Sequence, residues 1–210
     1  MNVETSKNLG GIGALLIVIG GLGLFGTGYA GLLSLVGLIL VLVAMKGLAD
    51  VYNEGGIFNN AFYGIIVAIV GVVVFVAAIV ATVFAVISIA GFNSMDPSTW
   101  SQQFTDVNAF TDLLGKAFGT AITGLVISLV ILFVSFIIAF IMVRKSLSLL
   151  ASRSGVGMFA TAGLLMLIGA LLTIVIIGLI LIWIGFILLT VAFFSIKPQA
   201  PSPPAPQQTA

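Results

Sequence analysis

Polar residues divide the chain into four long apolar blocks, at residues 8–45, 55–95, 117–143 and 154–196, and every Asp, Glu, Lys and Arg lies outside them. A charge at the centre of a membrane-spanning helix costs roughly 2.5 to 3.5 kcal/mol, whereas each Leu, Ile, Val or Phe there gains roughly 0.3 to 0.6 kcal/mol. Uncharged blocks of this length are typical of membrane spans. The pattern therefore predicts an integral membrane protein of the all-α class.

The number of spans follows from the lengths of the blocks. A single helix over residues 8–45 would be about 57 Å long, roughly twice the thickness of the hydrocarbon core, so we expect a turn at residues 26–29. The last block also needs two crossings, with a turn at residues 173–178, and the two middle blocks hold one crossing each. The sequence thus predicts a six-helix transmembrane bundle within one domain over residues 1–196, with spans at 9–25, 30–48, 61–91, 117–143, 157–174 and 178–196.

Two segments lie outside these spans. Residues 92–116 are predicted to form a short helix on the outer membrane surface, because Asp96 suits an N-cap, Pro97 suits the first helical position, and Trp100 begins a series of apolar residues at helical spacing. We expect Trp100 to lie in the interface. The three Asp residues of this segment match no calcium-binding loop and indicate a solvated face. The tail at 197–210 holds five of the six prolines and is predicted to be disordered.

The charges predict how the chain is threaded. With a cytoplasmic N-terminus, six of the seven basic residues lie on the cytoplasmic side, as the positive-inside rule requires. We therefore expect a multi-pass protein of the cell membrane with both termini in the cytoplasm. Lys46 and Asp50 are four residues apart, which suits a helical ion pair, and they are the only oppositely charged neighbours near a span on that side. We interpret them, with Arg144 and Lys145, as interfacial residues of the inner boundary.

Small residues recur at steps of three and four along three spans, which places them on one helix face. In lipid there is no hydrophobic force between helices, so close approach by small side chains holds them together. The alternative is that one such face lines a pore, but a water-filled path normally shows more polar side chains than this. We predict helix packing for Gly10, Gly13, Gly20, Gly64, Ala68, Gly71, Ala121, Gly124, Ser128 and Ser135.

A faint internal repeat links the two ends of the chain. Residues 14–20 resemble residues 163–169, and the glycines at 31 and 37 are echoed by glycines at 178 and 185. Transporters often carry such duplications. An alphabet of a few apolar residues also produces chance similarities, and we interpret the repeat as chance while leaving duplication open.

Composition removes several functional classes. The chain has no cysteine and no histidine, which excludes thiolate chemistry, His-ligated zinc and bis-histidine haem. We find no candidate catalytic, cofactor-binding or metal-binding residue, and we predict no enzymatic activity and no cofactor. The net charge of +1 gives no reason to expect nucleic acid as a partner. The expected partners are the lipid bilayer and either a second copy of the chain or another membrane subunit.

Three polar segments carry a resemblance to a known family. The sequences at residues 6–13, 46–50 and 56–61 resemble the N-terminal signature of a prokaryotic, largely archaeal family of small membrane proteins called domain of unknown function 996. The likeness covers chiefly the first 90 residues. It implies a membrane protein of archaeal origin, and it implies no mechanism. It draws attention to Asn8, Asn59 and Asn60, which we expect to cap helix ends.

Two classes of function remain. The first is a non-enzymatic membrane bundle that acts as a scaffold or accessory subunit and packs through its small-residue faces. The alternative is a transporter or channel for a small solute, which six spans and the repeat favour and the lack of charge within the spans opposes. A central polar cavity or a continuous water path would favour transport, whereas closed seams of Gly and Ala together with a lipid-exposed small-residue face would favour assembly.

Overall fold

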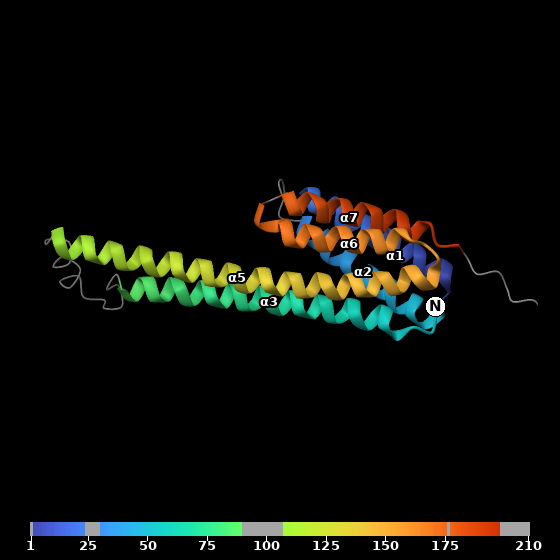
Figure 1. Ribbon diagram of the computed structural model, residues 1–210, viewed down its shortest axis with the longest axis horizontal. Helices are drawn as coiled ribbons and strands as arrows, with labels where there is room; N and C mark the ends of the chain where they lie inside the picture. Colours follow the sequence, from blue (N-terminus) through green and yellow to red (C-terminus); the bar gives the residue numbers. More distant parts are fainter. Residues whose placement is uncertain (1, 24–29, 90–106, 176, 198–210) are drawn as a thin grey trace, which may run out of the picture. The chain divides into compact units, whose positions relative to one another are not determined.

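The computed structural model describes residues 2–23, 30–89, 107–175 and 177–197. All regular structure within these ranges is helical, and six of the helices are long and apolar enough to cross a membrane. The predicted all-α class and the number of spans are therefore confirmed. In order along the chain, the elements are α1 Val3–Gly23, α2 Ala30–Val51, α3 Gly55–Ile89, α5 Val107–Ser154, α6 Met158–Leu171, the 3-10 turn η1 Leu172–Val175 and α7 Ile177–Phe194 (Figure 1).

Several helices extend beyond their predicted ends into polar sequence. Helix α1 begins at Val3 rather than at residue 9, because Asn2 caps it: the Thr5 backbone N–H donates to Asn2 Oδ1 at 2.7 Å. Helix α2 continues through Lys46 to Val51, and α3 already begins at Gly55. The apolar blocks locate the part of each helix that suits lipid, whereas capping and backbone hydrogen bonds decide where the helix ends. The turn expected at residues 26–29 lies outside the described residues.

Helix α5 has 48 residues and contains the fourth predicted span together with polar sequence on both sides. Residues 107–116, which the sequence assigned to the outer segment, form its first turns without a break before residue 117. Asp112 and Lys116 are joined there by an ion pair of 2.7 Å at the helical spacing of four. The rest of the outer segment, including Asp96, Pro97 and Trp100, lies outside the described residues, as does the tail beyond residue 197.

The last apolar block divides as the sequence predicts. Helix α6 tightens into the 3-10 turn η1, and α7 starts at Ile177. The Thr173 hydroxyl donates to the carbonyl of Gly169 at 2.9 Å, which satisfies a group at the end of α6. Gly169 and Gly178 face each other across the turn, and a Cβ on Gly169 would lie 2.7 Å from the Gly178 carbonyl oxygen. Two glycines thus allow the chain to reverse closely at this point.

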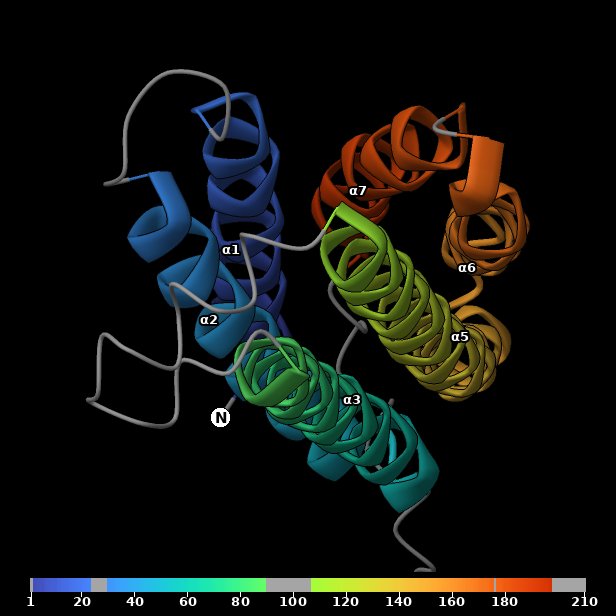
Figure 2. The same cartoon turned by 90° about the vertical axis from the view of Figure 1, so that its left-hand side faces the viewer.

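The chain divides into two compact units. Unit 1 comprises residues 1–64 and 140–210, and unit 2 comprises residues 65–139. Unit 1 therefore holds α1, α2, α6, α7, the first turns of α3 and the last turns of α5. Within it α1 packs along both α2 and α7, and α6 packs along α7 (Figure 2). That the two units form one transmembrane domain stays a prediction.

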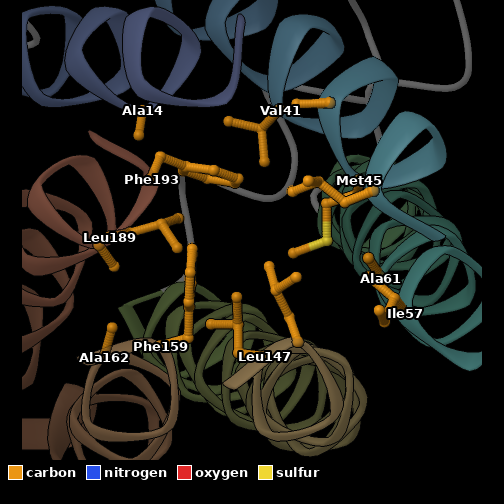
Figure 3. Packing of buried hydrophobic residues seen from close by; sticks show 14 of the residues in the cluster. Ala14, Val41, Met45, Ile57, Ala61, Leu147, Phe159, Ala162, Leu189 and Phe193 are labelled. Atoms are coloured by element: carbon orange, nitrogen blue, oxygen red, sulfur yellow. The ribbon is translucent and has the colours of Figure 1, made fainter. Parts of the chain in front are cut away.

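Unit 1 has a core of interlocking large side chains. Phe159 and Phe193 meet edge to face, with ring centroids 5.1 Å apart and planes at 81°, a favourable arrangement for two aromatic rings (Figure 3). The surrounding residues come from the end of α2, the start of α3, the end of α5 and the start of α6, so the core lies at the ends of these helices. Its fully buried large residues are Leu48, Ile57, Leu147, Leu150, Phe159, Met166, Phe193 and Ile196.

Unit 2 has a different construction, because its described residues, 65–89 and 107–139, belong to two helices. Residues of α3 and α5 pack through small side chains, and of the larger apolar side chains described in this unit none is buried and most are exposed. In the most apolar window of α3, and again in that of α5, only 11% of the residues are buried, against 33 to 39% in the other four spans. Such a surface in water would aggregate, and its apolar character suits contact with lipid or with another membrane helix.

Candidate functional site: helix seams and charged helix ends

The predicted small residues of α1 lie in a seam within unit 1. Gly10 lies against the ring of Phe193, so that any Cβ at Gly10 would overlap the ring. A Cβ at Gly13 would lie 2.7 Å from the carbonyl oxygen of Gly37 in α2, and Gly20 is buried as well. Glycine at positions 10 and 13 thus lets the backbone of α1 approach two neighbouring helices more closely than any other residue could.

The predicted small residues of α3 and α5 form a second seam, within unit 2. Gly71 contacts the Ser135 side chain, and Gly124 contacts the Thr82 side chain. Ser128 is buried between these two contacts along α5. The contacts run along the two helices in opposite directions, as in an antiparallel pair. Of the other residues predicted on these faces, Gly64, which belongs to unit 1, is buried, and Ala68 and Ala121 are half-buried.

The hydroxyl groups of the second seam bond within their own helices. Ser135 Oγ donates to the Ile131 carbonyl at 2.8 Å, Thr82 Oγ1 donates to the Ala78 carbonyl at 2.8 Å, and Ser128 Oγ donates to the Gly124 carbonyl. Each hydroxyl proton is therefore used by a carbonyl one turn back, and none of the three is donated across the seam. The seam consequently rests on van der Waals contact between small groups.

Two residues of the seams were missed by the sequence analysis. Thr82 follows Ala78 by four residues and so continues the small-residue face of α3, a signal that the spacing already contained. Gly163 of α6 lies with its Cβ position 3.1 Å from the Cα of Arg144 and 3.3 Å from the Leu147 Cβ in α5. The position of Gly163 in the repeat had been noted, but nothing in the sequence showed which helix it would contact.

The internal repeat has a counterpart in the contacts. Gly37 of α2 packs on Gly13 and on Ile17 of α1, with its Cβ position 2.9 Å from Ile17 Cγ1. At the positions equivalent in the repeat, Gly185 of α7 packs on Ala162 and on Met166 of α6, 2.6 Å from Met166 Cγ. The first and last helix pairs therefore place one glycine on corresponding residues. The other echoed glycines differ, since Gly31 has nothing within 4 Å of its Cβ position and Gly178 packs on Gly169. The interpretation of the repeat as chance stays a prediction.

The charged residues at one end of unit 1 form two ion pairs. Lys46 Nζ lies 2.8 Å from Asp50 Oδ1, and the same ammonium group lies 5.6 Å from the centroid of the Phe58 ring. Lys46 and Phe58 line a groove of about 410 Å³ between α2 and α3. This pair matches the spacing seen in the sequence, and both of its side chains are more than half exposed. It is therefore an exposed ion pair rather than a buried one, and its role as an anchor at the membrane boundary stays a prediction.

The second ion pair joins segments that are far apart in the sequence. Arg153 Nη2 lies 2.7 Å from Glu54 Oε2 and so connects the end of α5 to the α2–α3 turn. The hydrogen bond and positive charge of Arg153 hold the pKa of Glu54 below its ordinary value of 4.5. The expectation that Lys46 and Asp50 would be the only oppositely charged neighbours on this side is therefore wrong. A periodic pattern relates residues within one helix, so it does not indicate a contact between residues 99 positions apart.

A buried hydroxyl lies beneath these charges. Ser146 of α5 is fully buried and donates its proton to the Ile57 carbonyl in the first turn of α3, and its oxygen lies 3.4 Å from Met45 Sδ. The Ile57 carbonyl thus receives a side-chain donor in the apolar core. Because an unpaired hydroxyl in such a core is costly, this bond fixes the end of α5 against the start of α3.

The asparagines of the three polar segments do not cap helices, and that expectation is wrong. Asn8 lies inside α1, and Asn59 and Asn60 lie inside α3, because both helices begin earlier than the apolar blocks suggest. Asn60 Nδ2 instead donates to the Gly56 carbonyl at 2.6 Å. The capping asparagine is Asn2.

Arg144 and Lys145 are exposed where α5 leaves its apolar stretch. They line a groove of about 440 Å³ between α5 and α6. Neither takes part in a salt bridge within the part of the chain that the structure describes. Within those same residues no group of three or more His, Cys, Asp or Glu side chains gathers in a way that could hold a metal ion.

These features define an all-α membrane protein whose helices are joined by small-residue seams. More specifically, the chain belongs to the family described as "Protein of unknown function (DUF996)", whose sequence model matches residues 33–192. The match extends well beyond the first 90 residues on which the resemblance was noted, and the resemblance is confirmed. The chain is also 28% identical, over 197 residues, to Uncharacterized protein MJ1644 of Methanocaldococcus jannaschii, an alignment that covers 93% of this chain and 94% of that protein. No solved structure matches.

Proposed function

We propose that the protein is a non-enzymatic scaffold or accessory subunit of the membrane, which holds a second membrane subunit against the exposed faces of unit 2. One observation carries this proposal: the small-residue faces predicted for assembly are already filled by the chain's own helices, and long aliphatic faces remain uncovered in unit 2. A contact with another subunit would then use those faces.

The exposed face of α3 has the character of a contact surface. Valine dominates it, and a β-branched side chain has one preferred rotamer in a helix, so it loses little entropy when a neighbouring helix packs on it. The face continues at steps of three and four over more than three turns, through Ile69, Val72, Val73, Val76, Val80 and Val83. On α5 a similar exposed row comprises Phe118, Ile122, Leu125 and Leu129.

Transport of a small solute is the second candidate, and the repeated glycine contacts of α2 and α7 favour it. The close packing of the unit 2 seam weighs against it, because Gly71 and Gly124 lie directly against the Ser135 and Thr82 side chains. The apolar core of unit 1 weighs against it as well. We therefore rank assembly first.

Photocrosslinking in the native membrane tests the assembly role. A benzoylphenylalanine residue at Val73 or Val76 should give a discrete protein adduct of the same mass from both positions. The matched control is Leu35 of α2, which is 57% exposed and belongs to unit 1, and it should give lipid adducts alone. An adduct of twice the chain's mass would identify a second copy as the partner. Lipid adducts from all three positions would rule out the proposed role.

A flux assay tests the second candidate on the same protein. The purified chain is reconstituted in liposomes, and the efflux of small neutral and charged dyes is compared with that from empty liposomes. Under the assembly role no difference is expected. Gly37 and Gly185 make the corresponding contacts of the repeat. If the chain shows a saturable efflux, and if Gly37→Leu and Gly185→Leu both abolish it, the protein is a transporter and the assembly proposal is wrong.

We also propose that both chain ends face the cytoplasm of the cell, with the basic residues near Arg144 on the same side. The chain has no cysteine, so single cysteines report their own side without interference. Asn2→Cys and Ser202→Cys should be protected from an impermeant maleimide in intact cells and labelled after lysis. Labelling of either one before lysis contradicts this orientation.

A further inference from the structure

The groove between α5 and α6 combines two unlike surfaces. Arg144 and Lys145 are the first charged residues after the apolar stretch at 117–143, so they mark the level at which α5 leaves the hydrocarbon. Ile141 lies one turn deeper on α5, and Leu167 of α6 lines the same groove. The groove is therefore cationic at its outer end and apolar toward the membrane interior.

The backbone at this level is held in place. A Cβ added at Gly163 of α6 would lie 3.1 Å from the Arg144 Cα, closer than most Cβ contacts, so a glycine here lets the two backbones lie close together. Leu147, the next residue on that face of α5, is fully buried in the core of unit 1. The two basic side chains thus project from a fixed helix, while their charged groups stay exposed, and Ser148 presents a hydroxyl group one turn beyond Arg144.

The cations of this groove are not neutralised by the protein. Of the basic residues in the described ranges, Lys46, Lys116 and Arg153 form the three ion pairs, with Asp50, Asp112 and Glu54. Arg144 and Lys145 therefore bring two positive charges to one groove without a carboxylate in a salt bridge with either. A guanidinium group beside an ammonium group suits a phosphate, which accepts several charge-assisted hydrogen bonds at once.

We infer that this groove is a binding site for an anionic membrane phospholipid. The phosphate of the headgroup is held by Arg144 and Lys145 with a hydrogen bond from Ser148, and one acyl or isoprenoid chain lies along Ile141 and Leu167. Basic pockets between spanning helices at the membrane surface have the charge and depth for such headgroups. The site does not depend on the proposed assembly role, and its test is decided separately.

A second groove in the same unit supplies an internal comparison. The groove beside Lys46 has nearly the same volume, about 410 Å³ against about 440 Å³, and similar apolar walls. Its one cation, however, is paired with Asp50 and covers the Phe58 ring. The two grooves are thus similar in size, but the charged side chains of the Lys46 groove cancel whereas those of the Arg144 groove are both positive. Of the two, we therefore expect only the Arg144 groove to select anions. A free phosphate ion would make no favourable contact with the apolar walls, whereas a lipid chain would, so we assign the site to a lipid.

Native mass spectrometry of the full chain, released from detergent with defined lipids, tests this inference. With phosphatidylglycerol and phosphatidylcholine at equal concentrations, the chain should retain one phosphatidylglycerol in preference. The variant Arg144→Gln/Lys145→Gln should lose roughly 25-fold in affinity for phosphatidylglycerol, because each basic residue near an anionic surface contributes roughly fivefold. Its affinity for phosphatidylcholine should not change.

The matched control removes the same two charges elsewhere. Lys7→Gln/Lys197→Gln lies outside the groove and should change the phosphatidylglycerol affinity less than about threefold, since distant exposed charges are screened. A similar loss in both double variants would mean that net charge alone attracts the lipid, and it would overturn the site. So would an unchanged preference in Arg144→Gln/Lys145→Gln. Helical content by circular dichroism confirms that each variant is folded.

Two further arms separate the sources of phosphate and probe the walls. Inorganic phosphate at millimolar concentration should leave the bound lipid in place, and displacement by it would mean that the site takes a soluble anion instead. Leu167→Gln should weaken phosphatidylglycerol binding severalfold while leaving the salt dependence unchanged, because it alters the apolar wall and no charge. If Leu167→Gln binds phosphatidylglycerol as tightly as the original chain, the lipid chain does not lie against Leu167 and that part of the inference is wrong.

Discussion

Unit 1 and unit 2 hold their helices together by different means. In unit 1 large side chains from six helices interlock at the helix ends, and glycines bring backbones into contact deeper in the bundle. In unit 2 the two described helices meet through Gly71, Gly124 and their small partners, and most of the larger side chains are exposed. In lipid an apolar side chain gains little by leaving its surroundings, so packing quality decides stability in both units. The difference lies in what each unit leaves exposed.

The largest expected effect is in the aromatic core of unit 1. Phe193→Ala should lower the free energy of unfolding by about 3 to 5 kcal/mol, because a buried ring leaves a cavity that its neighbours fill only in part. Phe84→Ala in unit 2 is the control, since that ring is 65% exposed, and it should cost less than about 1 kcal/mol. Unfolding in mixed micelles with increasing sodium dodecyl sulfate measures both. Equal losses would mean that the two units do not differ in this way.

The seam of unit 2 should be sensitive to added volume. Gly124→Leu places a side chain where Thr82 lies and should cost about 1 to 3 kcal/mol and separate α3 from α5. Gly119→Leu lies on the same helix with nothing within 4 Å of its Cβ position, so it should be neutral or slightly stabilising. Spin labels at Val83→Cys and Leu125→Cys report the separation by electron resonance. An unchanged distance in Gly124→Leu would show that the seam does not set the pairing.

Two buried serines, one in each unit, test the comparison between unit 1 and unit 2. Ser146→Ala in unit 1 leaves the Ile57 carbonyl without its side-chain donor and should cost about 1 to 2 kcal/mol. Ser128→Ala in unit 2 removes a hydroxyl that only bonds its own helix, and it should change stability by less than about 0.5 kcal/mol. The same unfolding assay compares them. A larger loss at Ser128 would reverse the roles that we give to the two hydroxyls.

The smallest expected effect concerns the Glu54–Arg153 ion pair. The lowered pKa of Glu54 means that its contribution is complete above the ordinary value of 4.5 and is lost as the pH falls through the lowered value. Glu54→Gln should therefore melt slightly below the original chain at pH 7, and the two melting temperatures should converge as the pH falls through the lowered pKa of Glu54. Thermal scans at a series of pH values measure this. A gap that persists or widens in acid would assign the effect to something other than ionisation.

The number of spans and the seam residues could be predicted from the sequence, because both depend on local periodicity. A charge in lipid is costly, so the uncharged apolar blocks predicted the spans. Small residues that recur at steps of three and four predicted the packing positions Gly13, Gly71 and Gly124. Lys46 and Asp50 were found by the same kind of rule, since a spacing of four is a property of one helix.

The rest could not be predicted, because it depends on residues that only the folded chain brings together. Ser146 and Ile57 are 89 residues apart, and Glu54 and Arg153 are 99 residues apart. No periodic pattern selects one such pair among many. The early start of α1 does have a local signal, because Asn2 caps the helix. The predicted spans rest on apolar residues alone, so they do not include this cap in polar sequence.

The contact between Gly10 and Phe193 has a consequence for biosynthesis. The two residues are 183 positions apart, so at 5 to 20 residues per second the first helix is made roughly 10 to 40 seconds before its aromatic partner. During that interval lipid tails must occupy the place that the phenylalanine ring will take. The core of unit 1 therefore closes last, and a ribosome that stalls ahead of α7 would leave an open cleft for membrane proteases to recognise.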